Sequence, residues 1–227
     1  MPTAKDRLCH LLELAGEGPA QRAALVGELA DLLLGWPPDW PEAMRAPVVA
    51  LLEKTLRETD ETTRAELAAR LGGHGELPLE LVNEFYLSAP ARVRREILMR
   101  NEMAGDEAGE PGDAAAPNGA TLLADARDAK ARDFAGRLGA ALRIAPSTAE
   151  AILADATAEA LAVLCKGAHL DRAAFSALTL LEGAQHGDPL ARLDVYDTVP
   201  QRAAERLTRF WRIHHAPLEH SQTEAAE

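Results

Sequence analysis

Cysteine, aromatic residues and long apolar runs are scarce in this chain, and each scarcity argues against a class of protein. Two isolated cysteines, Cys9 and Cys165, fit a reducing cytosol better than a disulfide-stabilised secreted scaffold. No apolar stretch approaches the roughly 20 residues that a membrane-spanning helix needs. The N-terminus also lacks the basic region and apolar run of a secretion signal. The sequence therefore predicts a cytoplasmic protein without a membrane segment.

Motifs for metal, nucleotide or acyl-transfer chemistry are also missing. No Cys-x-x-Cys or His-x-x-x-His spacing occurs, and the glycines around His74 precede no Lys-Ser or Lys-Thr pair. A Gly-x-Ser-x-Gly nucleophile motif is absent as well. We therefore expect no catalytic residue, no metal site and no cofactor.

The net charge of −12 is spread over the whole chain. Basic and acidic residues number 12 and 17 in residues 1–103, none and 4 in 104–120, and 12 and 15 in 121–227. Binding to a phosphate backbone gains its free energy when lysine and arginine replace counterions. The acidic balance of every segment therefore disfavours nucleic acid as a general partner.

Proline and glycine punctuate a series of amphipathic helical patterns. Apolar residues recur at intervals of three and four, whereas no stretch alternates as a strand would. Ser147 and Glu150 have the spacing of a capping box, Asp171 is placed to cap a helix, and Leu170 with Phe175 has the spacing of a hydrophobic staple. Prolines that open a pattern are Pro78, Pro90, Pro146 and Pro200; glycines that follow one are Gly16, Gly35, Gly72, Gly167 and Gly183. Helices are expected over 5–15, 19–34, about 44–55, 61–71, from 78, from 90, from about 121, from 146, over 157–166, from 171 and over about 199–215.

These patterns predict an all-α protein of HEAT-like helical hairpins, which form an irregular α-solenoid or a bundle. Residues 1–103 and 121–216 are expected to be two helical blocks. Residues 104–120 contain four carboxylates and no leucine, isoleucine, valine or aromatic residue, and we interpret them as an acidic flexible loop or hinge. Residues 217–227 are expected to be a disordered tail.

Three stretches resemble a bacterial family of uncharacterised helical-repeat proteins, which is known only as a domain of unknown function. They are ALRIAPSTAEAILADATAEALAVLCKGAHLDRAAFSALTLLEGA (140–184), LPLELVNEFYLSAPARVRREILMRNE (77–102) and RLTRFWRIHH (206–215). The similarity lies in the order of short helices and caps. It implies a HEAT-like arrangement of helical hairpins and carries no activity or ligand.

Two clusters are candidate partner-binding sites. On the last predicted helix, Arg202, Arg206 and Arg209 follow at i, i+4 and i+7 and form one stripe, with Trp211 close by. The stripe has two interpretations, a solvated face with ion pairs and a site for an acidic partner. The segment 36–41 places Trp36 and Trp40 among three prolines. These two rings either pack on neighbouring helices or form a knob for a partner.

We therefore expect a non-enzymatic protein-interaction or regulatory scaffold of the bacterial cytoplasm, with an unknown and acidic protein partner. The alternative is a helical-repeat nucleic-acid enzyme similar to a DNA glycosylase. That alternative requires a basic concave face with aromatic residues and a carboxylate near an extruded base.

Deletion of residues 104–120 is expected to leave the fold intact, because the segment has no large apolar side chain to bury. Helical circular dichroism and a cooperative thermal transition should both persist in the deletion variant. Loss of either would contradict the hinge interpretation.

Overall fold

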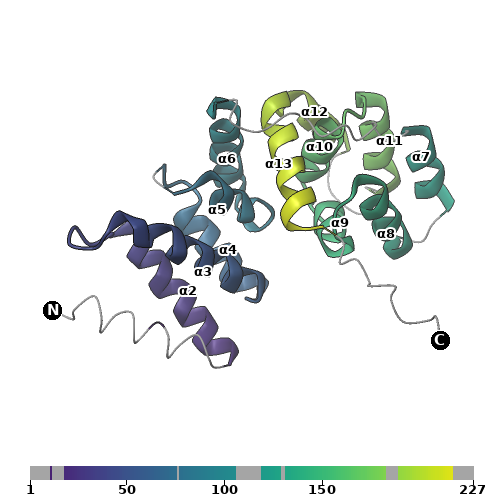
Figure 1. The fold of residues 1–227 in the computed structure, drawn as a ribbon. Helices are drawn as coiled ribbons and strands as arrows, with labels where there is room; N and C mark the ends of the chain where they lie inside the picture. Colours follow the sequence, from purple (N-terminus) through teal and green to yellow (C-terminus); the bar gives the residue numbers. More distant parts are fainter. Residues whose placement is uncertain are drawn as a thin grey trace, which may run out of the picture. The chain divides into compact units, whose positions relative to one another are not determined.

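The computed structural model describes residue 11 and residues 18–75, 77–105, 119–128, 131–182 and 189–216. Over these residues the structure is all-helical and contains no strand, so the all-α prediction is confirmed. The chain divides into two compact units, Met1–Ile97 and Leu98–Glu227, hereafter the N-terminal and C-terminal units. The α-helices with defined bounds are α2 (Pro19–Leu34), α3 (Arg45–Arg57), α4 (Glu61–Leu71), α5 (Leu79–Glu84), α6 (Ala91–Met103), α7 (Gly119–Asp128), α8 (Ala131–Leu142), α9 (Pro146–Leu153), α10 (Glu159–Gly167), α11 (Arg172–Glu182), α12 (Pro189–Thr198) and α13 (Gln201–His214) (Figure 1).

In the N-terminal unit the helices begin and end at the signals that the sequence supplies. Pro19 occupies the first turn of α2, where a missing N–H costs nothing, and Gly35 is the C-cap. Asp60 caps α4, because its carboxylate accepts a hydrogen bond from the backbone N–H of Thr63 at 2.9 Å. Both helices therefore have the bounds that the sequence predicts.

The core of the N-terminal unit comes from the apolar stripes of these helices. α2 packs against α3 and α4, α3 packs against α5, and α4 packs against the short 3₁₀-helix η2 (Tyr86–Ser88). Each contact buries side chains at helical spacing. Fully buried examples are Leu29, Leu52, Leu71, Leu81, Phe85 and Tyr86.

In the C-terminal unit the central element is α10. It contacts α9, α11, α12 and α13, and every residue from Ala160 to Cys165 is buried. A helix that is apolar on all sides is stable in water only when other helices surround it. The helices α9, α11, α12 and α13 therefore form a layer around α10.

A single glycine sets the distance between α10 and α13. A methyl group added at Gly167 would overlap the carbonyl oxygen of Ala204 and the hydroxyl of Thr208, both in α13. The sequence pattern predicts that Gly167 stops the helix. The left-handed residue after α10 is instead His169, with φ 58°, and Leu170 N–H closes the helix on the Cys165 carbonyl at 2.8 Å. Gly167 is thus the last helical residue, and its small size serves packing.

The last residues of α6 belong to the C-terminal unit, so the division between the units falls inside α6 and not within residues 104–120. The Glu102 carboxylate accepts a hydrogen bond from the Ala203 backbone N–H at 3.2 Å. It supplies the N-terminal acceptor that α13 lacks, since the N-cap of α13 is Pro200. The hydrogen bond between Glu102 and Ala203 therefore holds the end of α6 against the start of α13.

Two local predictions in the C-terminal unit are wrong. The Ser147–Glu150 capping box does not form, because α9 begins at Pro146 with Ala145 as its N-cap and Ser147 lies inside the first turn. The helix α12 was not predicted, since its apolar residues lack a clear helical period. The Asp171 cap is confirmed, with the Ala174 N–H donating to its carboxylate at 2.8 Å.

Several predicted segments lie wholly or partly outside the described residues. They are the helix over 5–15 apart from Leu11, the tail 217–227, and residues 106–118 of the predicted hinge. The flanks of that hinge are described: Ala104 and Gly105 follow α6, and Gly119 begins α7. A deletion that tests the hinge should therefore be confined to residues 106–118. The solenoid arrangement of the hairpins remains a prediction.

Gly167→Ala should lower the free energy of unfolding by about 1–3 kcal/mol, because the added methyl group overpacks the α10–α13 contact. A matched control is Gly136→Ala in α8, where an added Cβ meets no atom within 4 Å. The control should raise the stability by about 0.5–1 kcal/mol through helix propensity. Urea unfolding followed by circular dichroism measures both, and equal stabilities would contradict the packing role.

Candidate functional site

The predicted arginine stripe lies on α13, whose other face is part of the core. Ala203, Ala204, Leu207, Thr208, Phe210 and Trp211 of this helix are buried. Arg202 is exposed, whereas Arg206 and Arg209 are half-buried. The helical periodicity of the sequence therefore located the outward side of α13 correctly.

Arg206, in the middle of the stripe, binds the backbone within its own unit. Its guanidinium donates to the carbonyl oxygen of Ala104 at 2.8 Å and to that of Gly105. These carbonyls follow the C-terminus of α6, where a positive side chain satisfies unpaired acceptors. Glu102 of α6 and Arg206 of α13 thus bind each other's helix ends, and Arg206 has a structural task that its spacing did not reveal.

The same use of cations recurs at other helix ends. Arg212 donates from Nε to the Leu142 carbonyl at the end of α8, at 2.9 Å. Arg94 donates to the carbonyls of Leu87, within η2, and Ala89, just after it, at 2.9 and 3.0 Å. Partial burial, followed by the nearby charge of Arg143, lowers the pKa of Arg212, although an arginine remains charged at neutral pH.

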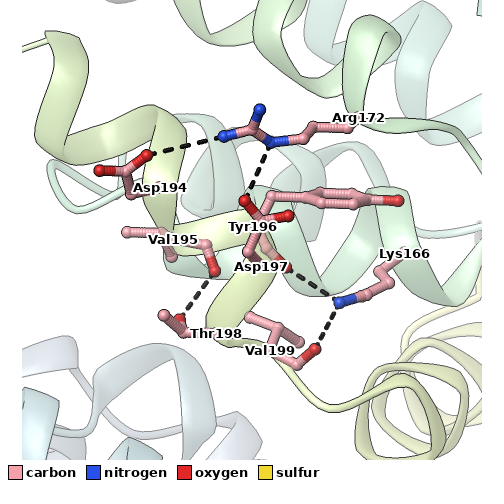
Figure 2. Close-up of polar contacts among 8 residues, drawn as sticks. All are labelled: Lys166, Arg172, Asp194, Val195, Tyr196, Asp197, Thr198 and Val199. Atoms are coloured by element: carbon pink, nitrogen blue, oxygen red, sulfur yellow. Dashed lines mark hydrogen bonds and ion pairs between the residues drawn. The ribbon is translucent and has the colours of Figure 1, made fainter.

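A further helix end of this kind is the junction of α10, α11 and α12 (Figure 2). Lys166 donates from Nζ to the carbonyl oxygens of Tyr196 and Val199, at 3.0 and 2.6 Å, and closes the end of α12. Its ammonium lies 4.9 Å from the centre of the Tyr196 ring. Arg172 pairs with Asp197 at 3.1 Å and with Asp194 at 3.6 Å.

Tyr196 at this junction is a structural hydrogen-bond donor. Its hydroxyl donates to the Leu170 carbonyl at 2.7 Å. Burial raises the pKa of Tyr196 above its usual value, and the negative charges of Asp171 and Asp197 raise it further. The phenol therefore stays protonated at neutral pH and keeps this bond.

Two of the three tryptophans, Trp40 and Trp211, are buried. Trp211 is fully buried in the core of the C-terminal unit, so the expectation that a partner packs on its ring is wrong. Trp40 is 6% exposed and meets Trp36 edge to face, with ring centres 5.5 Å apart. Trp36 is half-buried. The pair therefore matches the interpretation in which these rings pack on the N-terminal unit.

Cys165 is buried, and two of the described histidines, His214 and His215, contact neighbouring side chains. Cys165 is fully buried, and desolvation raises the pKa of its thiol to about 12. His214 stacks on Phe210 with ring centres 4.5 Å apart, and His215 Nδ1 lies 3.1 Å from the Thr148 hydroxyl. Within the described ranges, no group of three His, Cys, Asp or Glu side chains could hold a metal ion, and no helix is long and apolar enough to cross a membrane.

Exposed apolar side chains form a second candidate surface, which the sequence pattern did not predict. For a single leucine, isoleucine or methionine at the edge of an apolar helical stripe, the sequence pattern does not show whether the side chain is buried or exposed. In the part of the chain that the structure describes, all the large apolar side chains that are exposed lie in the C-terminal unit. They are Met99 (52%), Met103 (71%), Leu180 (54%), Leu181 (42%), Leu190 (72%) and Ile213 (65%).

Comparison of the chain with family models, with curated proteins and with solved structures found no match. The resemblance to a helical-repeat family therefore remains a prediction.

Arg206→Met should lower the free energy of unfolding by about 1–2 kcal/mol, because it removes charge-assisted hydrogen bonds to the carbonyls after α6. The matched control is Arg95→Met at an exposed position of α6, which should stay within about 0.5 kcal/mol of the parent protein. Chemical denaturation measures both variants. Equal stabilities of the two variants would contradict the structural role of Arg206 and favour the interpretation of the stripe as a solvated face.

Proposed function

We propose that this chain is a non-enzymatic protein-interaction scaffold of the bacterial cytoplasm whose partner-binding surface lies on the C-terminal unit. The observation that carries the proposal is the confinement of exposed large apolar side chains to that unit, among the described residues. Exposed apolar side chains that gather on one surface mark interaction sites more often than isolated ones do.

The three exposed leucines on α11 and α12 support the proposal most directly. Leu180 and Leu181 lie near the end of α11, Leu190 lies near the start of α12, and the two helices pack against each other. A partner that covered these side chains would gain about 25 cal/mol for each Å² of apolar surface removed from water. This end of the α11–α12 hairpin is therefore the best candidate for the central part of an interface.

The arginine stripe has a reduced role in the proposal. Arg202 and Arg209 lie on the outward side of α13 as a proposed rim facing an acidic partner, whereas Arg206 binds the end of α6. Charged residues at a rim chiefly steer association and select partners. With these separate roles for the arginines, the proposal still includes the acidic partner that the sequence suggests.

The cations that bind helix ends also weigh against the glycosylase-like alternative. Arg94, Lys166, Arg206 and Arg212 all donate to backbone carbonyls. Cations used in this way contribute less to a continuous positive groove for phosphates, in a chain that is already acidic. These contacts support the scaffold over a nucleic-acid enzyme.

A charge-placement experiment tests the proposal in the full chain. The double variant Leu181→Asp/Leu190→Asp puts two carboxylates on the proposed surface, and proteins captured from the native host are quantified by mass spectrometry. Capture of the principal partner should fall at least tenfold, because an unpaired carboxylate in an interface costs more than about 1.4 kcal/mol.

The matched control is Ala140→Asp/Ala151→Asp, which adds the same charge at exposed positions of α8 and α9. The control should retain the partner at the parent level. Equal capture by the parent protein and the Leu181/Leu190 variant would refute this surface, as would equal losses in both variants.

A further inference from the structure

The outward side of α6 carries positive and apolar side chains in one row. Exposed residues follow along this helix at intervals of three and four, so they share one face. The opposite face is buried, at Val93, Ile97 and Asn101. The row, hereafter the α6 stripe, consists of Arg92, Arg95, Met99 and Met103.

Met99 and Met103 are the apolar part of the α6 stripe. Their side chains are 52% and 71% exposed. Because residues at i and i+4 are neighbours on a helix surface, the two methionines form one apolar spot. Methionine is unbranched and polarisable, so it adapts its shape to the side chains of a partner. This spot is therefore suited to packing against aliphatic groups.

The two carboxylates of α6 are bound at the edges of the stripe. Arg92 Nε donates to the Glu96 carboxylate at 3.1 Å, and a Cβ atom added at Gly73 would overlap that carboxylate, which thus lies against the loop after α4. Glu102 accepts from the Ala203 N–H. With four arginines and two glutamates, α6 is a positive helix in a chain of net charge −12. The stripe itself contains no carboxylate.

The length of the α6 stripe matches one face of a second helix. From Arg92 to Met103 the helix rises by roughly 16 Å, at about 1.5 Å per residue, which is about three turns. A helix beside α6 would place its own side chains at i, i+3, i+4 and i+7 against this row. Its carboxylates would meet the arginines, and its aliphatic side chains would meet the methionines.

We propose that the α6 stripe docks an acidic amphipathic helix of a partner protein, whose carboxylates pair with Arg92 and Arg95 and whose aliphatic side chains pack on Met99 and Met103. This site adds a second surface to the proposed function. It rests on that function only because its occupant is taken from a protein partner, and it does not include the exposed leucines of α11 and α12.

Charge favours an acidic helix over the other anionic surfaces that arginines bind. A nucleic acid or an anionic membrane extends beyond the stripe, so it meets the repulsion of a protein with a net charge of −12. A short helix carries only a few carboxylates and faces the stripe alone. Arginine also binds a carboxylate through two parallel hydrogen bonds, which match the planar shape of that group.

The first measurement uses the full chain and a fluorescent acidic peptide made of two repeats of the heptad Glu-Leu-Ala-Glu-Leu-Leu-Glu. Fluorescence anisotropy should show saturable binding, which should weaken as the salt concentration rises. Arg92→Glu/Arg95→Glu should weaken binding at least tenfold. The matched control is Lys54→Glu/Arg127→Glu, which makes the same change in net charge at exposed positions of α3 and α7 and should bind within twofold of the parent.

The second measurement tests the apolar part of the stripe. Met99→Gln/Met103→Gln keeps the side-chain length and the helix propensity but makes both side chains polar. Peptide binding should weaken at least threefold, whereas the circular dichroism and the melting temperature should stay at the parent values, because both positions are exposed.

Four results would overturn the proposal. Equal binding by the parent and either stripe variant would remove the stripe as the site, and equal binding of a peptide with lysine in place of glutamate would remove the charge match. Competition by phosphatidylglycerol vesicles would change the class of partner. Self-association of the parent in sedimentation, lost in the methionine variant, would assign the stripe to a second copy of the chain.

The site and the proposed function can fail separately. If the acidic peptide does not bind but the Leu181/Leu190 variant still loses its partner, only the α6 stripe is refuted. If the peptide binds as expected while the Leu181/Leu190 variant retains the partner, the leucine surface is refuted and the α6 stripe is supported.

Discussion

The close approach of α10 and α13 at Gly167 is the constraint on which the C-terminal unit depends. Because Gly167 lets the backbone of α13 reach α10 at Ala204 and Thr208, α10 can be covered on the side that α9, α11 and α12 leave open. The neighbouring Lys166 then reaches the carbonyls at the end of α12, and Gln201 donates to the Lys166 carbonyl at 3.2 Å. A larger residue at 167 would move each of these contacts, since packed interiors have little free volume.

The unpaired carbonyl groups at the ends of short helices are a second constraint. They explain where several positive side chains of this acidic protein bind. A helix of ten residues leaves about four carbonyls without an intrahelical hydrogen-bond partner. In a protein made of such short helices, a large share of the backbone carbonyls therefore needs partners from elsewhere. Arg94, Lys166, Arg206 and Arg212 donate to carbonyls that follow or end η2, α12, α6 and α8. The dipole of each helix favours the same placement. Positive residues in a stripe on one helix can therefore bind the carbonyl ends of neighbouring helices and need not indicate a partner site.

Helix positions were largely predictable from sequence where local chemistry decides them. α2 and α4 have the predicted bounds, because proline, glycine and a capping aspartate act within a few residues. α12 was missed because its stability comes from tertiary contacts with α10 and α11, which leave little periodicity in ten residues. Gly167 was misinterpreted for a related reason: a stop signal and a close helix contact both require a small residue, and only the position of α13 separates them.

The candidate site was less predictable, because exposure depends on which helices meet. Periodicity gave the correct outer face of α13, yet it could not show that the end of α6 occupies Arg206 or that the core encloses Trp211. A cation on the packed side of a helix needs either an acceptor within the fold or one from outside. The structure supplies acceptors for the cations at helix ends, whereas the buried Nε atoms of Arg22, Arg64 and Arg192 have no hydrogen-bond partner among the described residues.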